Sequence, residues 1–155
     1  MWTQYGSPLS TDEAQNRSRY LRFKPAENNL VLLAMRTWVI LYNPPSFTNL
    51  RAKLYSDRNG LPSGLIATSS NAWTKAEMLT TYNYGTKEIY FEFDPKITLH
   101  KNVYYHFVLN CDNYTYSDES HIAWRIGWPD PIYGTATSNN LLYSPYIFSL
   151  IGADL

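Results

Sequence analysis

The stretch LYSDRNGLPSGLIATS (residues 54–69) decides the fold class of this chain. It joins two strand-like runs through a turn that is rich in Asp, Asn, Gly and Pro. Gly60 and Gly64 can take the positive φ that tight turns need, and Pro62 presets φ near the turn value. Asp57 and the nearby Asn can hydrogen-bond their own backbone two residues further on. The chain is therefore predicted to reverse direction here, as it does in a β-sandwich.

Runs of alternating apolar and polar residues lie on both sides of this turn, and such alternation is typical of half-buried strands. Residues 30–42 instead carry apolar side chains at odd and at even positions, and the run ends at Asn43, Pro44 and Pro45. This run predicts a central strand that is covered on both faces and bulged midway. The predicted strands comprise residues 21–24, 30–42, 50–55, 65–67, 89–93, 97–99, 103–109, 122–126 and 146–152. Pro95 is expected to break the chain between the fifth and the sixth of them.

The alternation also assigns the side chains of these strands to an inner and an outer face. Ile89, Phe91 and Phe93 are predicted to form the core face of their strand. The side chains predicted to point inward from the later strands are Val103, Tyr105, Phe107, Leu109, Ile122, Trp124 and Ile126. Those predicted to point outward are Tyr104, His106 and His121.

Composition supports an all-β fold of one domain. The chain has 155 residues and is 16% aromatic, with 14 Tyr, against 17% charged residues. Aromatic and β-branched residues suit a pleated, half-buried surface, and tyrosine suits contact surfaces. Residues 1–17 carry no clean period and are interpreted as an extended N-terminal arm. Residues 18–155 are predicted to form the sandwich domain.

Charge and hydropathy exclude several classes of partner. Lys plus Arg equals Asp plus Glu at 13 each, which removes the general electrostatic attraction to nucleic acid or to an anionic membrane. The basic residues Arg17, Arg19, Arg22 and Lys24 are interpreted as a solvated strand face. The first residues contain neither a basic nor an apolar region of a signal peptide, and the apolar run 30–35 is too short to cross a bilayer.

The sequence offers little catalytic or metal-binding chemistry. The three histidines lie on separate predicted elements, without the spacing of a zinc site, although His106 and His121 could approach across adjacent strands. Asp57 with Asn59, or Asp112 with Asp118, could hold a cation, but a structural turn is the favoured interpretation of the first pair. The single cysteine, Cys111, is expected to be a small buried apolar residue. We expect no catalysis and no cofactor.

Exposed aromatic residues are the other candidate site. The axial C–H face of a sugar stacks on an aromatic ring, while nearby polar side chains bind its hydroxyls. The candidate glycan-binding residues are Trp73, Tyr82, Tyr84, Trp128 and Tyr133. The alternative interpretation is that these side chains cover loops or pack on a partner subunit.

The order of these elements resembles the jelly-roll modules that are repeated in phage and bacterial surface proteins. The resemblance covers residues 20–152, and the segment 68–87 departs from the compact pattern. The motifs that carry it are the turn at residues 54–64, LIATS at 65–69, FEF at 91–93, ITL at 97–99, VYYHFVL at 103–109 and FSL at 148–150. It implies an antiparallel, jelly-roll-like β-sandwich of eight or nine strands, found in virion fibres, decoration proteins and carbohydrate-binding appendages alike.

These observations lead to a functional prediction. The chain is expected to be a non-enzymatic phage or virus structural protein, a decoration or fibre-type component of a capsid or tail surface, located in the virion and assembled in the host cytoplasm. It would dock on other virion proteins as a homo-oligomer or symmetric assembly, with no nucleic acid or membrane as partner. The predicted docking residues are Trp2, Tyr5, Arg17 and Arg19. The alternative is a carbohydrate-binding module that recognises host or surface glycans.

Overall fold

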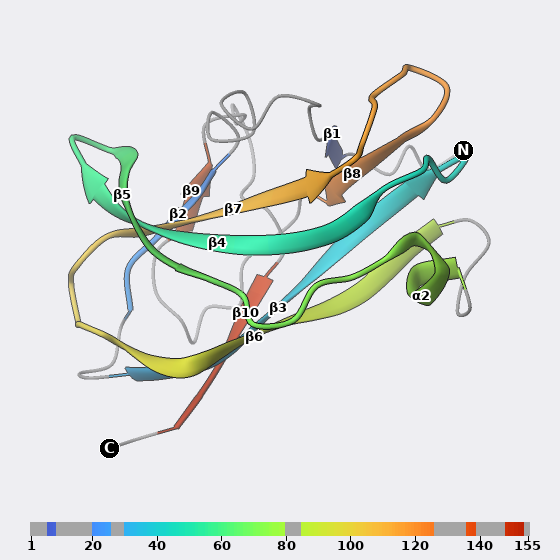
Figure 1. Ribbon diagram of the computed structural model, residues 1–155. Helices are drawn as coiled ribbons and strands as arrows, with labels where there is room; N and C mark the ends of the chain where they lie inside the picture. The colour runs from blue at the N-terminus through green and yellow to red at the C-terminus, as the bar shows by residue number, and fades with distance from the viewer. Residues whose placement is uncertain are drawn as a thin grey trace.

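The computed structural model describes residues 6–8, 20–25, 30–79, 85–125, 136–138 and 148–153. These residues form ten β-strands and one short helix, so the predicted all-β class is confirmed (Figure 1). The helix is α2 (Lys75–Leu79). The strands are β1 (Gly6–Pro8), β2 (Leu21–Phe23), β3 (Leu30–Tyr42), β4 (Thr48–Arg58), β5 (Leu61–Thr68), β6 (Gly85–Leu99), β7 (Tyr105–Asp112), β8 (His121–Arg125), β9 (Ala136–Ser138) and β10 (Phe148–Ala153).

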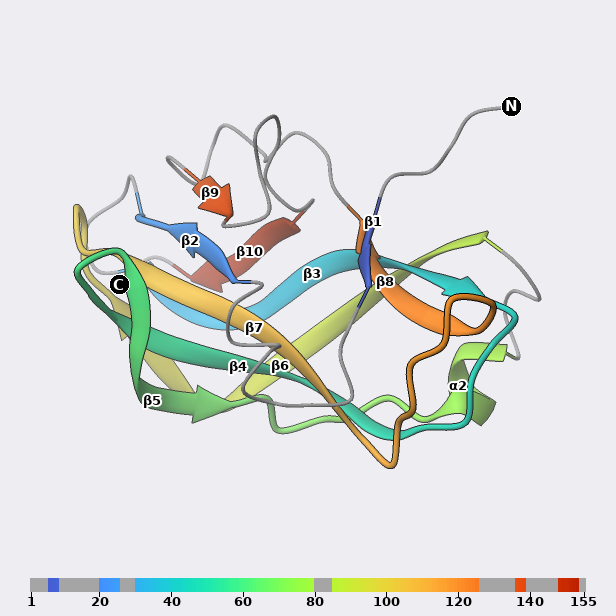
Figure 2. The ribbon, with the colours of Figure 1, turned by 90° about the horizontal axis from the view of Figure 1, so that it is seen from above.

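The strands form two antiparallel sheets whose order is that of a jelly roll. Sheet A contains β1, β8, β3 and β6 in that order, and β10 joins it beside β3. Sheet B has the order β5, β4, β7, β2 and β9. Apart from the β4–β5 hairpin, successive strands alternate between the two sheets, and such crossing connections characterise double-sheet jelly rolls. Figure 2 shows β5 at one margin of sheet B.

The strands β3 and β6 pair along most of their length. β3 is the long, largely buried central strand that the apolar run predicts, and its pairing with β6 is bulged. The predicted break at Pro95 is wrong, because β6 runs through it. Leu32 pairs with Ile97 and Ala34 with Glu92, so residues 93–96 bulge out of the ladder. Proline is tolerated there because a bulge requires no ladder hydrogen bond from its nitrogen.

Part of the expected N-terminal arm belongs to the sandwich. Residues 6–8 form β1, which pairs with β8 through the partners Gly6 with Arg125 and Pro8 with Ala123. The strand is short, and its residues are too few for a period to be visible in the sequence. The other strand that the sequence did not predict, β9, is equally short.

The hydrophobic core lies between the sheets and matches the predicted inner faces closely. Ile89, Phe91 and Phe93 are buried in it, and the rings of Phe23 and Phe107 stack at 5.0 Å. The largest fully buried side chains are Trp124, Phe23, Phe91, Phe107, Leu21, Leu32, Met35, Ile40 and Leu50. Among the described residues, no helix is long and apolar enough to span a membrane.

Two side-chain predictions are wrong, and one possibility left open by the sequence is excluded. Val103, predicted to point inward, is 45% exposed because β7 begins only at Tyr105. His106, predicted to face solvent, is fully buried. His106 and His121 do not approach each other across adjacent strands, because β7 lies in sheet B and β8 in sheet A.

Candidate functional site

The edge strand β5 is the most exposed strand for which side chains are described. Among the described strands it pairs with β4 alone, so the other side of its backbone faces outward. Leu61, Leu65 and Ile66 are 58%, 54% and 42% exposed. None of its eight residues is charged. Edge strands in soluble proteins commonly carry charges, prolines or bulges that block pairing with another chain. β5 lacks the charges, but it contains Pro62 and pairs irregularly with β4.

This edge is formed by the hairpin within residues 54–69. Asn59 and Gly60 take φ values of 55° and 84°, as the two central residues of a tight hairpin turn do. The expectation of positive φ is confirmed for Gly60 and wrong for Gly64, which lies inside β5. There the Gly64 N–H donates to Ser56 Oγ at 2.9 Å, next to an irregularity in the β4–β5 pairing. Pro62 fits because an edge strand tolerates a residue without an N–H.

The edge of sheet A that β6 forms is covered by hydrogen bonds from the segment that follows β5. The side-chain amide of Asn71 donates to Tyr90 O at 2.9 Å and accepts from Glu92 N at 2.7 Å, so it acts like a residue of a paired strand. The indole N–H of Trp73 donates to Tyr90 O at 2.8 Å, and Ser70 N donates to Glu92 O at 2.7 Å. The chain that leaves β5 therefore occupies hydrogen-bonding groups of β6, whereas no described strand pairs with the outer side of β5 itself.

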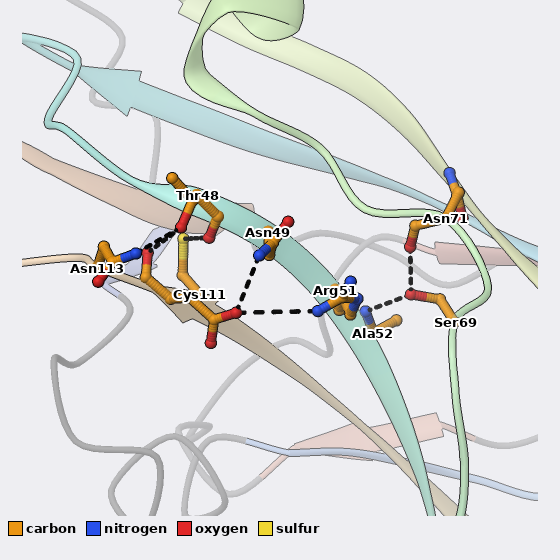
Figure 3. Close-up of polar contacts among 9 residues, drawn as sticks. Thr48, Asn49, Arg51, Ala52, Ser69, Asn71, Cys111 and Asn113 are labelled. Atoms are coloured by element: carbon orange, nitrogen blue, oxygen red, sulfur yellow. Dashed lines mark hydrogen bonds and ion pairs between the residues drawn. The ribbon is translucent and has the colours of Figure 1, made fainter.

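The segment that covers β6 is itself held against β4. The Ser69 hydroxyl accepts from Ala52 N at 3.2 Å and donates to Asn71 O at 2.8 Å (Figure 3). Trp73 pairs its backbone with Leu50 of β4 in both directions, at 2.9 Å each. The connection thus bridges the two sheets.

A polar cluster on three adjacent strands of sheet B supports the base of the hairpin. Asp57 Oδ1 accepts from Arg22 Nε of β2 at 2.9 Å and lies 2.7 Å from His106 Nε2 of β7. Its second oxygen accepts from the Gly60 N–H of the hairpin turn at 3.4 Å. The guanidinium of Arg22 also stacks 3.5 Å from the centre of the Tyr104 ring. Asp57 therefore links the turn to β2 and β7.

The surroundings of this cluster favour the neutral form of His106 and the ionised form of Asp57. Burial lowers the pKa of His106 below its ordinary 6.5, and the hydrogen bond to Asp57 opposes this shift only in part. Partial burial raises the pKa of Asp57, but its hydrogen bonds with Arg22, His106 and the Gly60 N–H together lower it below 3.8. His106 is thus neutral beside an ionised Asp57, and its Nε2 carries the proton because a carboxylate only accepts.

The other imidazole nitrogen lies in an unusual environment. His106 Nδ1 is buried and has no hydrogen-bond partner among the described residues, and Tyr20 lies edge-on to the ring at 4.8 Å. Protonation of this nitrogen would add a buried, unpartnered donor next to Arg22, which is already positive. Acid is therefore expected to destabilise this part of sheet B.

The pKa shifts predict the direction of the pH dependence of stability. Because the pKa of His106 is lower in the folded state, its contribution is full above pH 6.5 and is lost as the pH falls toward its folded pKa. Asp57 acts in the same direction below about pH 4. We expect the free energy of unfolding, measured by urea denaturation, to fall from pH 7 to pH 5. The fall should be smaller in His106→Phe than in the wild type; an equal fall in the two proteins would contradict this assignment.

A second polar cluster fixes the start of β4 on the end of β7 (Figure 3). Asp112 Oδ2 accepts from Asn49 Nδ2 at 3.2 Å and lies 3.8 Å from Arg51 Nη1. Asn113 Nδ2 donates to Thr48 Oγ1 at 2.9 Å. These contacts hold an irregular stretch of the β4–β7 ladder.

Cys111 lies beside this cluster and is buried, as predicted. Burial raises the pKa of its thiol to about 12, so the sulfur stays protonated at neutral pH. The side chain behaves as a small apolar residue.

The candidate cation ligands already have protein partners. Both oxygens of Asp57 interact within the hairpin cluster, and Asp112 interacts with Asn49 and Arg51. The hydroxyl of Tyr116 donates to Asp118. In the part of the chain that the structure describes, no group of three or more His, Cys, Asp or Glu side chains could hold a metal ion.

Of the predicted glycan-binding residues, only Trp73 lies among the described residues. It is partly buried against the core, and its indole N–H donates to the backbone of β6. Its ring therefore helps to cover that edge of sheet A. The other four, Tyr82, Tyr84, Trp128 and Tyr133, lie outside the described residues. So do the predicted docking residues Trp2, Tyr5, Arg17 and Arg19, and both proposals stay predictions.

Sequence reasoning missed the two features that define the site. The absence of charge from residues 61–68 was visible in the sequence, and in an edge strand it removes one of the features that block pairing with another chain. The joining of Asp57, His106 and Arg22 had no comparable signal. Comparisons with protein-family models, curated proteins and solved structures found no match to this chain.

Proposed function

We propose that this chain is a non-enzymatic structural component of a virion, on a capsid or tail surface, that docks on a neighbouring virion protein through the free edge of β5. The observation that carries the proposal is the contrast between two edge strands. Asn71 and Trp73 occupy backbone groups of β6, whereas among the described strands β5 pairs only with β4 and exposes Leu61, Leu65 and Ile66.

Such an edge recognises a partner by strand addition. An incoming strand gains main-chain hydrogen bonds along the edge, and its side chains gain apolar contacts at alternate positions. Leu65 and Ile66 are consecutive and both are exposed, at a point where the β4–β5 pairing is irregular. A docked strand would contact these exposed apolar side chains beside the edge. Jelly rolls serve as virion and as lectin domains, so the fold is compatible with this role without specifying it.

The proposal is tested in particles that carry either the wild-type chain or Ile66→Lys. The charge should not affect folding, because Ile66 is exposed, but it should block the added strand. We expect the wild-type chain to co-purify with particles on a density gradient and the variant to be lost from them.

Tyr90→Lys is the matched control, because Tyr90 is 39% exposed on the edge strand β6, which is already covered. It should be incorporated normally. Circular dichroism of each purified variant confirms folding. Absence of the wild-type chain from particles, or equal incorporation of Ile66→Lys, would overturn the proposal.

A further inference from the structure

The tip of the β4–β5 hairpin carries the only Asn-Gly pair of the sequence. Asn59 and Gly60 are the two loop residues, because Arg58 pairs directly with Leu61. We infer that this pair is a site of intramolecular modification, at which the backbone nitrogen of Gly60 attacks the Asn59 side chain and converts it to aspartate or isoaspartate. The reaction requires only this chain and water, so it is independent of the docking proposed above.

The reaction consists of ring closure followed by hydrolysis. A bond forms between Gly60 N and Asn59 Cγ, and the bond between Cγ and Nδ2 breaks. The proton lost from Gly60 N leaves with the amide group as ammonia, and a succinimide ring remains. Water then opens the ring on either side of the nitrogen. Cleavage at Cγ gives aspartate, whereas cleavage at the backbone carbonyl carbon gives isoaspartate, in which the chain continues through Cγ.

The attacking nitrogen of Gly60 is accessible. It lies in the turn, outside the ladder that begins with the Arg58–Leu61 pair. Among the described residues its N–H contacts Asp57 Oδ2 at 3.4 Å, which is long for a hydrogen bond. A Cβ placed on Gly60 would meet no atom within 4 Å, so the space beside this residue is open. Glycine also lacks the side chain that would obstruct the approach of Cγ.

The amide that is attacked is also free to move. Asn59 is exposed at the hairpin tip, and its side chain has no hydrogen-bond partner among the described residues. Rotation of this side chain toward Gly60 N therefore breaks no contact within the described part of the chain. Asparagine is one of the chemically labile residues of proteins, and here its exposure and its glycine neighbour act together.

Other asparagines of the chain provide internal controls. Those with positive φ besides Asn59 are Asn43, Asn49, Asn102 and Asn113. The residues that follow them are Pro44, Leu50, Val103 and Tyr114. Proline has no N–H to lose, and the other three carry side chains that obstruct the attack. Asn102 is the best match, because it is exposed and its φ of 63° is close to the 55° of Asn59.

Modification would alter the hairpin in two ways. Isoaspartate adds a carbon atom to the backbone of a two-residue loop, and loop length determines which turn can close the hairpin. Both products also place a new carboxylate at the turn, where the ionised Asp57 already contacts the Gly60 N–H. Like charges at this distance repel each other. We therefore expect modification to loosen the end of the hairpin from which β5 begins.

Incubation of the folded full-length chain at mildly alkaline pH tests the site. Peptide mapping by mass spectrometry detects the loss of ammonia and the uptake of water at each asparagine, and an isoaspartyl methyltransferase labels the isoaspartate. We expect Asn59 to react at least about tenfold faster than Asn102, because only Asn59 precedes a glycine. Equal rates at the two positions would overturn the inference. So would modification of Asn59 in urea but not in the folded chain over the same time.

Amide hydrogen exchange of the separated products tests the effect on the hairpin. The isoaspartate form should exchange faster than the wild type at the start of β5. Asn59→Asp supplies the new charge without the extra backbone atom, so its increase should be smaller. If the isoaspartate form exchanges like the wild type, the expected loosening of the hairpin is overturned.

Discussion

Replacing Asp57 by alanine should lower the free energy of unfolding by about 2–4 kcal/mol. The substitution removes the carboxylate that interacts with Arg22 Nε at 2.9 Å and His106 Nε2 at 2.7 Å. Arg22 would keep its charge without this partner, and the fully buried His106 would lose the acceptor of its N–H. Urea denaturation at pH 7 measures the effect.

The expected loss depends on the position of Asp57 and not on its charge alone. Asp118→Ala removes an exposed carboxylate from a connecting segment and should change the unfolding free energy by less than about 0.5 kcal/mol. Asp57→Asn keeps a side-chain oxygen as an acceptor and should fall between the two. If Asp57→Ala were as stable as Asp118→Ala, the cluster would not support the sheet.

The hairpin that carries β5 should respond to the same substitution. Asp57 also accepts the Gly60 N–H in the turn, so its loss should loosen the end of the hairpin more than the rest of sheet B. Amide hydrogen exchange of β5 measured under native conditions would report this difference. A uniform increase in exchange over both sheets would instead indicate global destabilisation.

Trp124→Ala should produce the second large effect, a loss of about 3–5 kcal/mol of unfolding free energy. Trp124 is fully buried on β8, and its indole N–H donates to Thr37 Oγ1 of β3 at 2.8 Å. Alanine would leave a cavity between the sheets, and it would remove the donor of that hydrogen bond. Such a loss is a large part of the roughly 5–15 kcal/mol that stabilises a typical domain.

Two smaller substitutions separate packing from hydrogen bonding. Thr37→Val keeps the volume of the side chain and removes its hydroxyl, and should cost about 1 kcal/mol. Trp124→Phe retains much of the buried ring and should be intermediate. A cost for Trp124→Ala no larger than that for Thr37→Val would show that the site collapses without a cavity.

The elements that were predicted correctly depend on local chemistry. Asn59 and Gly60 determine the hairpin turn because few other residue pairs take two successive positive φ values. The inner faces of β6 and β7 follow from the two-residue period of a strand, which assigns Phe91 and Phe107 to the core. The prediction at Pro95 was wrong because the bulge opposite β3 depends on pairing with a distant strand.

The sequence by itself determined the all-β class, the hairpin at residues 54–69 and most of the core faces, because turn chemistry and alternation act over a few neighbouring residues. Only the tertiary structure decided that β5 is the last of the described strands of sheet B, since edge status depends on which strands pair. It also decided that Asp57 joins Arg22 and His106, which lie 35 and 49 residues away along the chain. Their meeting follows from the order β4, β7, β2 in sheet B, and no local pattern encodes it.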